Sequence, residues 1–530
     1  MACIAAMLRV DSRARAVVRC AVMASAVPSQ GKDLIGNAPE ETRRGADGSL
    51  LLHMRDLGAA PASGRLLRGL TPWLDAEKVK DVFLLAERRW KEPWSDSKSA
   101  VIYQELVHWR REGSGGAYRG AAWKDPPIEW NEVAAVFERE PASLVDYTAR
   151  RAGAALVTNR EPLRLGVHHV PKPWGREGWY TGIEQRGLSR IVSSTGESPL
   201  PYALGMFPWP LLRQHDRTPV LLKTLEPHPD EVLGDLYLEV HERKWETYVV
   251  LQVDPAAWPD GVGYLRAGLN LDTIEALRGA HGDRWREEAG RELRRRIAVY
   301  EQVRNNIDAL LGEKLKHAGA DPAQPVPPKL YHELTSTLPA PLREQERRAQ
   351  QDVEAMLGRT PLRIGDVVAL PPGVLHSLQH GVKVVEFQTA TYERMIAMFT
   401  QKVLTQSHWD TDKALASMEM APYKPPLPVP VTDAEGILAQ RVVTYPEFTV
   451  NRVRIDAGRT WTQETLDRYR LLFVVEGAGR IRLAEGQEVA LAKEDAFLIP
   501  ATLGPFEIAA SSAARLTYLD SAPTAEPVPD

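Results

Sequence analysis

Two short segments, one ending at Glu246 and the other at His376, constrain this chain more than any other feature. The first contains Glu239, His241 and Glu246, and the second runs from Gly365 through a Pro-Pro-Gly corner to His376. Imidazole and carboxylate groups contributed by separate parts of a chain are typical of a metal site. If the two segments form one site, the fold must place strands from both segments around the same interior.

The first segment is predicted to supply ligands from two adjoining strands. Alternation along an extended strand sends Glu239 and His241 to one face, while Leu238 and Val240 point the other way into packing. A tight, polar turn then returns Glu246 on a neighbouring strand, because the residues after it are β-branched and apolar. A carboxylate and an imidazole on one strand would therefore lie beside a second carboxylate on the next.

The second segment is predicted to supply one more ligand, His376. It follows an apolar run and a corner ending at Gly373, which can admit a close backbone approach. A glutamate and a histidine two positions apart are common in strands without any metal. Because both segments also carry matched glycine and proline spacing, we predict one metal site formed by Glu239, His241, Glu246 and His376.

These spacings resemble the two motifs of the cupin superfamily, whose small antiparallel β-barrels direct metal ligands inward. Within that superfamily the chain resembles the type I phosphomannose isomerases (mannose-6-phosphate isomerase class I-like proteins) from about residue 163 to residue 520. The motifs that carry the resemblance occur in the family's order: Trp174-Gly175, Glu239-Val240-His241, Lys244-Trp245-Glu246, Pro371 to His376, and Glu386-Phe387-Gln388 followed by Arg394.

The resemblance and the texture of the sequence predict a mainly β protein. It would contain an RmlC-like cupin β-barrel with a helical insertion, a C-terminal second cupin-like barrel and an N-terminal helical region. The predicted parts are an extension or disordered segment (1–64), the N-terminal helical region (65–162), the first part of the metal-binding cupin barrel (163–271), the helical insertion (272–358), the second part of the barrel (359–421), and the C-terminal cupin-like domain without a metal site (431–522).

Hydrophobic spacing underlies the helical parts of this division. Apolar residues in Val79–Trp90 and in Val133–Leu144 suit amphipathic helices, as do those of the insertion in Leu277–Leu311. Residues 31–64 are rich in Gly, Pro, Ala and charge, so we expect little order there. No histidine follows His408. The C-terminal domain therefore cannot repeat a histidine site, and we expect it to serve packing or dimer contact.

Composition excludes several classes of partner. With 66 basic and 70 acidic residues the net charge is −4, and no block of like charge implies nucleic acid or a membrane surface as a partner. No stretch approaches the roughly 18 apolar residues of a membrane span. The only cysteines, Cys3 and Cys20, give no disulfide framework, which fits a cytoplasmic location. The first 30 residues only faintly resemble a transit peptide, and we expect a disordered extension or an upstream start codon.

The family resemblance implies a metal-dependent aldose-ketose isomerase that converts mannose 6-phosphate to fructose 6-phosphate through an enediolate. The metal of that family is typically zinc. A divalent cation touching two substrate oxygens would stabilise the charge that develops when a carbon-bound proton is removed. The expected partner is a sugar or sugar phosphate, and the protein could form a homodimer.

Three further residues are predicted to act on the substrate. Lys244 lies on the same strand face as Glu246, where a nearby cation would favour its neutral amine, so it is a candidate acid or base. Glu386 lies in an apolar strand whose low dielectric would raise the pKa of a carboxyl, which makes it a second proton shuttle. Arg394 could clamp an anionic substrate or stabilise enediolate charge.

Departures from the family pattern leave the ligand set open. Glu239 replaces the family's glutamine, and two carboxylates would neutralise a divalent ion, which allows manganese, iron or cobalt in place of zinc. The segment containing Glu226 and His228 also reads Glu-x-His and could claim the first two ligand positions. We favour Glu239 and His241, because Pro227 would remove a ladder hydrogen bond within a central strand.

The substrate and the class of activity also have alternatives. The path from Gln388 to Arg394 is shorter than in the family, and no glycine-rich loop is present to cradle a phosphate. Lys172, Arg176 and Lys402 are unplaced cations that could meet one. An unphosphorylated sugar is therefore an alternative substrate. A cupin oxygenase that uses iron on the same ligands, or a sugar-binding regulatory protein, is an alternative function, since a fold alone decides neither.

Overall fold

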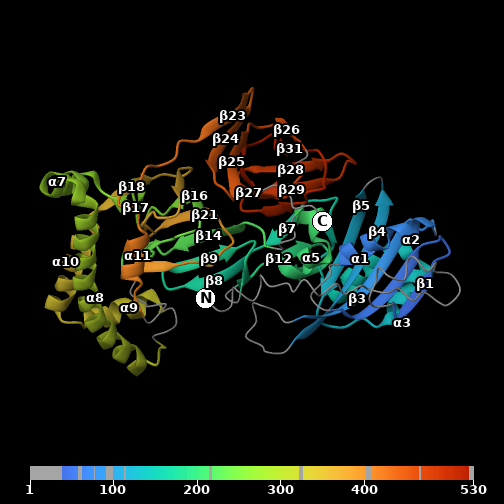
Figure 1. Ribbon diagram of the computed structural model, residues 1–530, viewed down its shortest axis with the longest axis horizontal. Helices are drawn as coiled ribbons and strands as arrows, with labels where there is room; N and C mark the ends of the chain where they lie inside the picture. Colours follow the sequence, from blue (N-terminus) through green and yellow to red (C-terminus); the bar gives the residue numbers. More distant parts are fainter. Residues whose placement is uncertain are drawn as a thin grey trace.

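The computed structural model describes residues 39–57, 63–76, 78–90, 100–112, 115–184, 187–213, 218–321, 326–400, 408–464 and 467–524. Cys3, Cys20, Lys402 and most of the predicted N-terminal extension lie outside these residues. Figure 1 shows an N-terminal α/β region at one end, a long helical insertion at the other, and two β-rich regions between them. In the described part of the chain, we find no helix whose length and apolar character would let it cross a membrane.

The N-terminal region is built on a six-stranded sheet, with strand order β1-β2-β3-β4-β5-β6. Only β2 and β3 run parallel. Its elements are β1 (Glu41–Arg44), β2 (Leu50–Leu57), α1 (Ser63–Gly69), α2 (Thr71–Ala76), β3 (Asp81–Trp90), β4 (Val101–Glu112), β5 (Gly115–Trp123), α3 (Trp130–Arg139), α4 (Leu144–Ala152) and β6 (Val157–Thr158).

The prediction of a helix over Val79–Trp90 is wrong, because most of that run forms β3. Val82 and Leu84 pack into one hydrophobic core, and Phe83 and Leu85 pack into another on the opposite face. A strand buried on both faces has no polar alternation, so its sequence resembles that of a buried helix. The helices expected around Val133 and Leu144 do form, as α3 and α4.

Two strands, β1 and β2, also form between residues 41 and 57, where the sequence suggested a tail with little order. Leu51 is buried against Phe83 and Phe137, and Leu52 is buried in the core on the other side of the sheet. The N-terminal region is therefore a mixed α/β unit and not a helical one. Amino-acid composition did not predict these strands, because the apolar residues that pack against them belong to other parts of the sheet.

The predicted cupin consists of two sheets that share one core. One sheet has the order β19-β16-β21-β14-β9-β8 and the other has the order β18-β17-β20-β15-β22. Their strands are β8 (His168–Lys172), β9 (Gly175–Trp179), β14 (Leu221–Pro227), β15 (Leu238–Val240), β16 (Glu246–Val253), β17 (Gly263–Leu269), β18 (Leu357–Leu362), β19 (Val367–Leu370), β20 (His376–Leu378), β21 (Val382–Gln388) and β22 (Met395–Met398).

The predicted mainly β cupin fold is therefore confirmed, with two open sheets in place of a closed cylinder. Tyr248 from the first sheet and Leu265 from the second lie in the same buried cluster. Gln388 and Leu370 flank Glu246 on neighbouring strands of the first sheet. Segments from both sides of the insertion thus alternate within each sheet, which is why the two sequence motifs can meet.

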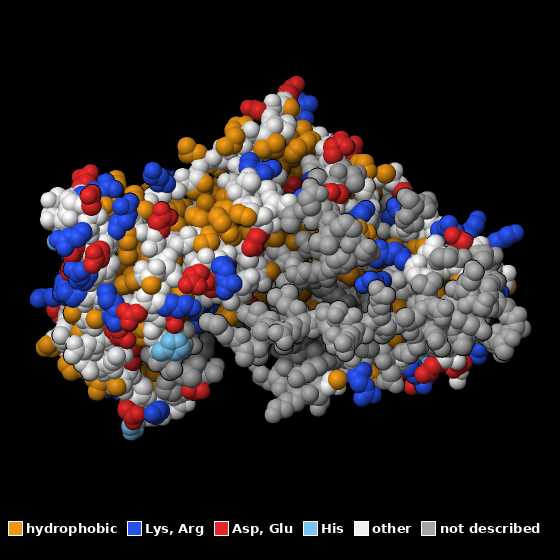
Figure 2. All heavy atoms as spheres, in the orientation of Figure 1, with side chains coloured by type: hydrophobic (Ala, Val, Ile, Leu, Met, Phe, Trp, Pro, Cys, Tyr) orange, Lys and Arg blue, Asp and Glu red, His pale blue; other side chains and the backbone are white. Residues whose placement is uncertain are grey.

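The helical insertion connects β17 to β18, which pair antiparallel. It contains α7 (Leu271–His281), α8 (Trp285–His317), α9 (Pro328–Ser336) and α10 (Ala340–Glu354). Leu293, Ile297 and Tyr300 of α8 belong to the same core as Leu238 and Val240 of β15. Figure 2 shows positive and negative side chains interspersed over the outer face of the insertion. Its apolar stripe therefore packs behind a strand of the cupin while its charged face meets solvent.

The C-terminal domain contains a nine-stranded sheet, β13-β12-β7-β30-β27-β32-β25-β24-β23, and a four-stranded sheet, β26-β31-β28-β29. Its own strands are β23 (Val429–Ala434), β24 (Ile437–Thr444), β25 (Phe448–Ile455), β26 (Thr460–Gln463), β27 (Arg470–Glu476), β28 (Ala478–Leu483), β29 (Glu488–Ala492), β30 (Ala496–Ile499), β31 (Phe506–Ala510) and β32 (Leu516–Pro523). The short helix α11 (Thr411–Ser417) precedes it.

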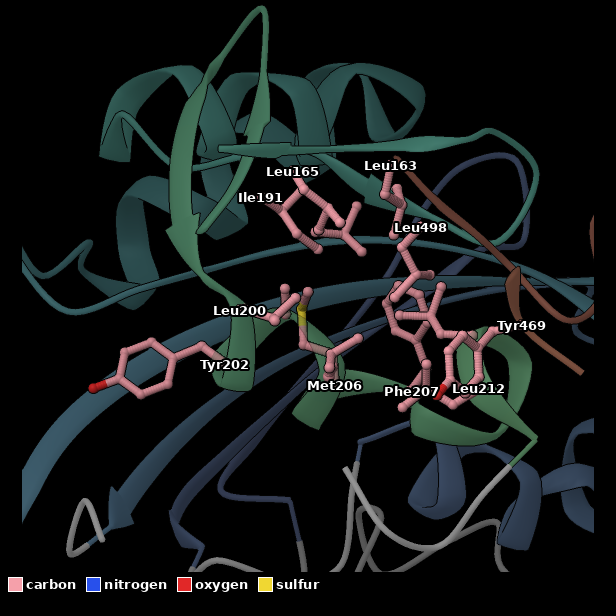
Figure 3. Close-up of a cluster of buried hydrophobic side chains, with 14 of the residues drawn as sticks. Leu163, Leu165, Ile191, Leu200, Tyr202, Met206, Phe207, Leu212, Tyr469 and Leu498 are labelled. Atoms are coloured by element: carbon pink, nitrogen blue, oxygen red, sulfur yellow. The ribbon is translucent and has the colours of Figure 1, made fainter. Parts of the chain in front are cut away.

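Three strands assigned by sequence to the metal-binding barrel join the C-terminal sheet instead. They are β7 (Leu163–Gly166), β12 (Arg190–Ser193) and β13 (Gly196–Pro199), and β7 pairs antiparallel with β30. Figure 3 shows Leu163, Leu165 and Ile191 close to Leu498 in one apolar cluster, with α5 (Leu200–Met206) beneath. Residues 163–199 therefore extend the C-terminal sheet, and one hydrophobic core, which includes Leu165, Val385 and Leu498, joins this sheet to the cupin.

This junction predicts a large effect of Leu498→Ala on stability. Leu498 is fully buried in the cluster, so truncation should lower the free energy of unfolding by about 2 to 5 kcal/mol through lost burial and a cavity. Leu427→Ala is the matched control, because that leucine is 86% exposed and its truncation should change stability by less than about 0.5 kcal/mol. Urea unfolding monitored by tryptophan fluorescence measures both, and equal midpoints would contradict the shared core.

Candidate metal centre

Strand pairing brings the two sequence motifs together. Glu239 of β15 lies directly opposite His376 of β20 on the neighbouring antiparallel strand. His241 directly follows β15, and the N–H of Gly373 donates to its carbonyl oxygen at 2.8 Å. Gly373 has φ +87°, a conformation that favours glycine, so the Pro-Pro-Gly corner makes the close approach expected of it. Ligand atoms of Glu239, His241 and His376 all lie within 4.8 Å of one another.

The fourth predicted ligand comes from the other sheet. Glu246 begins β16, and its side chain is 2% exposed. Its Oε1 lies 3.5 Å from Nε2 of His241, and its Oε2 lies 3.4 Å from Nε2 of His376. Glu246 therefore lies beside both histidines where the two sheets meet, but it is not in the group of mutually close ligand atoms, which consists of Glu239, His241 and His376 in the described part of the chain.

The donor set fits a divalent metal ion. Nδ1 of His376 lies 2.9 Å from the carbonyl oxygen of Val374, which identifies Nδ1 as the protonated nitrogen and leaves the lone pair on Nε2. Nε2 of His376 and both ring nitrogens of His241 are buried without a hydrogen-bond partner. Buried imidazole nitrogens beside carboxylates are the arrangement that zinc and similar cations satisfy.

The charges around Glu246 favour its carboxylate form. Although burial opposes ionisation, Lys244 and the two histidines hold the pKa of Glu246 well below its usual range. Burial and then the positive charge of Lys244 lower the pKa of His241. Burial also opposes the charged form of His376, but the negative charges of Glu246 and Glu239 raise its pKa overall.

Lys244 lies at the centre of this arrangement. It is buried, and its Nζ is 2.5 Å from Oε1 of Glu246. The hydroxyl of Tyr248, on the same strand as Glu246, donates to Oε2 at 2.9 Å. Alternation along β16 places Glu246 and Tyr248 on one face, as the pleat requires. The predicted acid or base therefore touches a predicted ligand.

Glu386 is buried on β21, opposite Lys223 of β14, whose Nζ is 3.1 Å from Oε2. Burial raises the pKa of the Glu386 carboxyl well above its usual value; Lys223 opposes this, and the charge of Glu246 reinforces it. The low-dielectric environment expected from the apolar strand is thus present. Arg394 lies with its guanidinium carbon 5.1 Å from the centre of the Tyr237 ring.

A cavity of about 990 Å³, measured out to its open mouth, joins these groups. Its lining includes five of the seven predicted site residues: Glu239, Lys244, Glu246, Glu386 and Arg394. His241 and His376 do not line the cavity, but each contacts Glu246, which does. The space within it that is open to water-sized molecules is about 180 Å³.

The sequence reasoning missed two charged residues of the cavity, Lys223 and Glu177. Glu177 is buried and lies 3.1 Å from Nζ of Lys172 and 3.7 Å from Nζ of Lys223, and it accepts a hydrogen bond from the indole of Trp179 at 2.8 Å. Although burial opposes ionisation, these partners lower the pKa of Glu177 to about 2. A single lysine within the leucine-rich run of β14 was the signal that could have identified Lys223.

In the competing Glu-x-His segment, Glu226 forms ion pairs outside the predicted metal centre. Glu226 lies 2.6 Å from Nε of Arg176 and 3.3 Å from Nζ of Lys383. Pro227 is the last residue of β14, where a missing N–H interrupts little of the ladder. The cluster of possible ligands found in the described part of the chain does not include Glu226 or His228. Arg176 is 55% exposed and paired with Glu226, so it does not join the cavity.

Metal binding should depend on the two histidines. We expect wild-type protein to bind one divalent ion per chain. His241→Ala or His376→Ala should weaken binding by more than about 100-fold, because even residues that only support a metal ligand contribute about 10- to 100-fold to the affinity. His408→Ala, at an exposed histidine, should leave the affinity unchanged. Equilibrium dialysis of metal-stripped protein against Zn²⁺, followed by elemental analysis, measures this. Unchanged affinity in both variants would exclude the site.

The Glu177 charge predicts an acid-sensitive contribution to stability. Because the folded pKa of about 2 lies below the unfolded value of about 4.3, its contribution is complete above pH 4.3 and is lost as the pH falls toward 2. Glu177→Gln should therefore unfold more easily at pH 7, by on the order of 3 kcal/mol. In urea titrations the difference between the two proteins should shrink below pH 4.3 and nearly disappear as the pH approaches 2. A constant difference from pH 7 to pH 3 would contradict this assignment.

Comparison with known proteins supports the family resemblance. Residues 440–517 match the family model described as "Mannose-6-phosphate isomerase, cupin domain". This match lies in the C-terminal domain, which carries none of the four predicted ligands. No curated protein matches the chain at a significant level.

Several solved structures of phosphomannose isomerases align with the chain. The mannose 6-phosphate isomerase of Bacillus subtilis is 16% identical, with 68% of this chain and 99% of that chain covered and a TM-score of 0.45. A point mutant of phosphomannose isomerase from Salmonella typhimurium is 18% identical, with 68% and 98% covered and a TM-score of 0.44. A zinc-bound mannose 6-phosphate isomerase is 16% identical, with the same coverage and a TM-score of 0.43. The C-terminal match confirms that the chain carries a cupin domain similar to that of mannose-6-phosphate isomerases.

Proposed function

We propose that this protein is a metal-dependent aldose-ketose isomerase acting on a hexose phosphate, with mannose 6-phosphate to fructose 6-phosphate as the first candidate reaction. One observation carries the proposal: buried Lys244 and buried Glu386 border the same cavity as two of the predicted metal ligands, Glu239 and Glu246. An isomerase needs proton-transfer groups beside a cation, whereas an oxygenase or a sugar sensor does not. The family match of the C-terminal domain supports the same activity.

Glu239, His241, Glu246 and His376 would hold the metal. Zinc suits the two imidazoles, and manganese, iron or cobalt would also suit a set with two carboxylates. When bound, the cation would polarise the sugar carbonyl and stabilise the negative charge of the enediolate. Tyr248 and Lys244 hold the Glu246 carboxylate in place for this role.

Proton transfer between C1 and C2 of the sugar would fall to the buried side chains. A carboxyl whose pKa is raised, as at Glu386, can hold a proton at its oxygen near neutral pH and exchange it with the substrate. Lys244 offers a second exchangeable proton at Nζ, beside Glu246. Arg394, at the edge of the cavity, would orient the substrate through its guanidinium donors.

Aromatic side chains shape the remaining walls of the cavity. Trp174 and Trp179 are almost fully buried, and Tyr237 lies beneath the Arg394 guanidinium. Apolar ring faces of this kind pack against the carbon-bound hydrogens of a sugar and exclude water from the reacting atoms. A linear, open-chain sugar could therefore extend from the metal ligands toward Arg394.

The charge pattern favours a second candidate, an isomerase of an unphosphorylated sugar. Each lysine that lines the cavity lies within reach of a carboxylate: Lys172 meets Glu177, Lys223 meets Glu177 and Glu386, and Lys244 meets Glu246. Cations that already neutralise buried carboxylates are poorly placed to receive a phosphate. The assay must therefore include both substrate classes.

Isomerase activity should require metal and both predicted proton shuttles. We expect metal-stripped protein to be inactive on mannose 6-phosphate or on free mannose, and Zn²⁺, Mn²⁺, Co²⁺ or Fe²⁺ to restore turnover. Lys244→Ala and Glu386→Gln should each lower kcat by about 10²- to 10⁴-fold while Glu386→Gln retains the metal. The exposed Glu435→Gln serves as the control for loss of a carboxylate.

Product formation is followed by chromatography after incubation with each sugar, including fructose and lyxose. Turnover only with the phosphate ester establishes the first candidate, and turnover only with free sugars establishes the second. If no sugar reacts with any of the metals, or if Lys244→Ala and Glu386→Gln are as active as wild type, the isomerase proposal fails.

A further inference from the structure

The turn that carries Lys244 is held by side chains from a distant segment. Backbone N–H groups of four consecutive residues, 242 to 245, all donate to side-chain oxygen atoms of Glu393 or Thr389. Oε1 of Glu393 accepts the N–H of residue 242 at 2.9 Å, and Oε2 accepts those of residues 243 and 244 at 2.9 and 3.1 Å. Oγ1 of Thr389 accepts the N–H of Trp245 at 3.2 Å.

The contact is also reciprocal. The backbone N–H of Thr389 donates to the carbonyl oxygen of Trp245 at 3.0 Å, so the segment 389–393 follows the turn along its whole length. The turn joins His241 to Glu246, the predicted ligands on its two sides. Any shift of the turn would therefore move Lys244 and both ligand positions together.

The carboxylate form of Glu393 suits this environment. Although partial burial opposes ionisation, the backbone N–H groups of Arg243 and Glu242 lower the pKa of Glu393 below its usual value. Successive N–H groups that converge on one carboxylate form an anion-binding nest, and the bonds are strengthened by the charge. A neutral side chain of the same shape would bind the turn less well.

Glu393 also lines the cavity. It directly precedes Arg394, and both residues line the cavity together with Lys244. Through the turn, Glu393 therefore sets the position of a predicted acid or base beside a predicted substrate-binding cation.

We propose that Glu393 is a positioning residue. Its carboxylate clamps the 242–245 turn and thereby fixes the position of Nζ of Lys244 relative to the cavity and to Arg394. The consequence for catalysis rests on the proposed isomerase function, whereas the clamp itself does not. Glu393 acts through the backbone of the turn and needs no contact with substrate or metal.

The test compares Glu393→Gln with a matched control on the turn itself. Glutamine keeps the size of the side chain but presents an amide NH₂ in place of one oxygen, so it repels at least one N–H of the turn. Glu242→Gln removes the same charge from the same turn, but the Glu242 side chain accepts from Ser417 Oγ at 2.9 Å and makes none of the clamp bonds. Thr389→Val removes a single acceptor, that of Trp245.

The first readout does not depend on any activity. In Glu393→Gln we expect amide hydrogen exchange of residues 242–244 to accelerate about tenfold or more, because a net hydrogen bond is lost. We also expect Lys244 to react faster with an amine-specific reagent, as measured by peptide mass spectrometry. Glu242→Gln should match wild type in both measurements. Thr389→Val should accelerate exchange mainly at Trp245, and it remains informative if Glu393→Gln does not fold. Unchanged exchange and labelling in folded Glu393→Gln would overturn the clamp.

The second readout uses the isomerase reaction. Glu393→Gln should lower kcat by about 10- to 100-fold, because small misplacement of a reacting group is costly, while KM stays within about twofold and the metal content is unchanged. Glu242→Gln should retain wild-type kcat. A wild-type kcat in Glu393→Gln would overturn the positioning role. If wild-type protein turns over no sugar, the proposed function fails, and amide exchange and lysine labelling still decide the clamp.

Discussion

The burial of one carboxylate, that of Glu246, is the constraint on which the rest of the site depends. An ionised group removed from water is stable only when charges and hydrogen-bond donors surround it. The imidazoles of His241 and His376, the ammonium of Lys244 and the hydroxyl of Tyr248 all converge on Glu246. Because Glu246 begins a strand of one sheet and the histidines follow or begin strands of the other, its neutralisation ties the two sheets together at the predicted metal centre.

The surrounding domains reinforce the strands that carry these groups. Helix α8 of the insertion packs against Leu238 and Val240, the residues on either side of Glu239. From the C-terminal domain, the hydroxyl of Tyr445 donates to the backbone carbonyl of Glu246 at 2.8 Å, and its ring lies 4.8 Å from that of Trp245. The region that matches the mannose-6-phosphate isomerase cupin family includes Tyr445. The domain without ligands therefore supports the domain that has them.

The pKa values of two carboxyls of the same cavity are shifted in opposite directions by their surroundings. Glu177 receives Lys172, Lys223 and an indole N–H, which lower its pKa to about 2 despite burial. Glu386 meets Lys223 but also faces the charge of Glu246, and burial raises its pKa well above normal. Environments that separate the pKa values of neighbouring carboxyls are a general means of assigning proton-transfer roles. In this cavity the raised pKa makes Glu386 the candidate proton shuttle of the proposed reaction.

The resemblance of the sequence motifs predicted the cupin fold. Strand alternation and the turn residues at Gly373, which act over a few positions, predicted the residues around the metal centre. Hydrophobic spacing predicted the helical insertion. It misjudged β3, since a strand buried on both faces loses the alternation that distinguishes it from a helix. Only the tertiary structure decided that β7 joins the C-terminal sheet, that Lys223 faces Glu386, and that Glu393 holds the turn of Lys244. These contacts join residues far apart in the chain, and their energies depend on burial and charge pairing that no local pattern encodes.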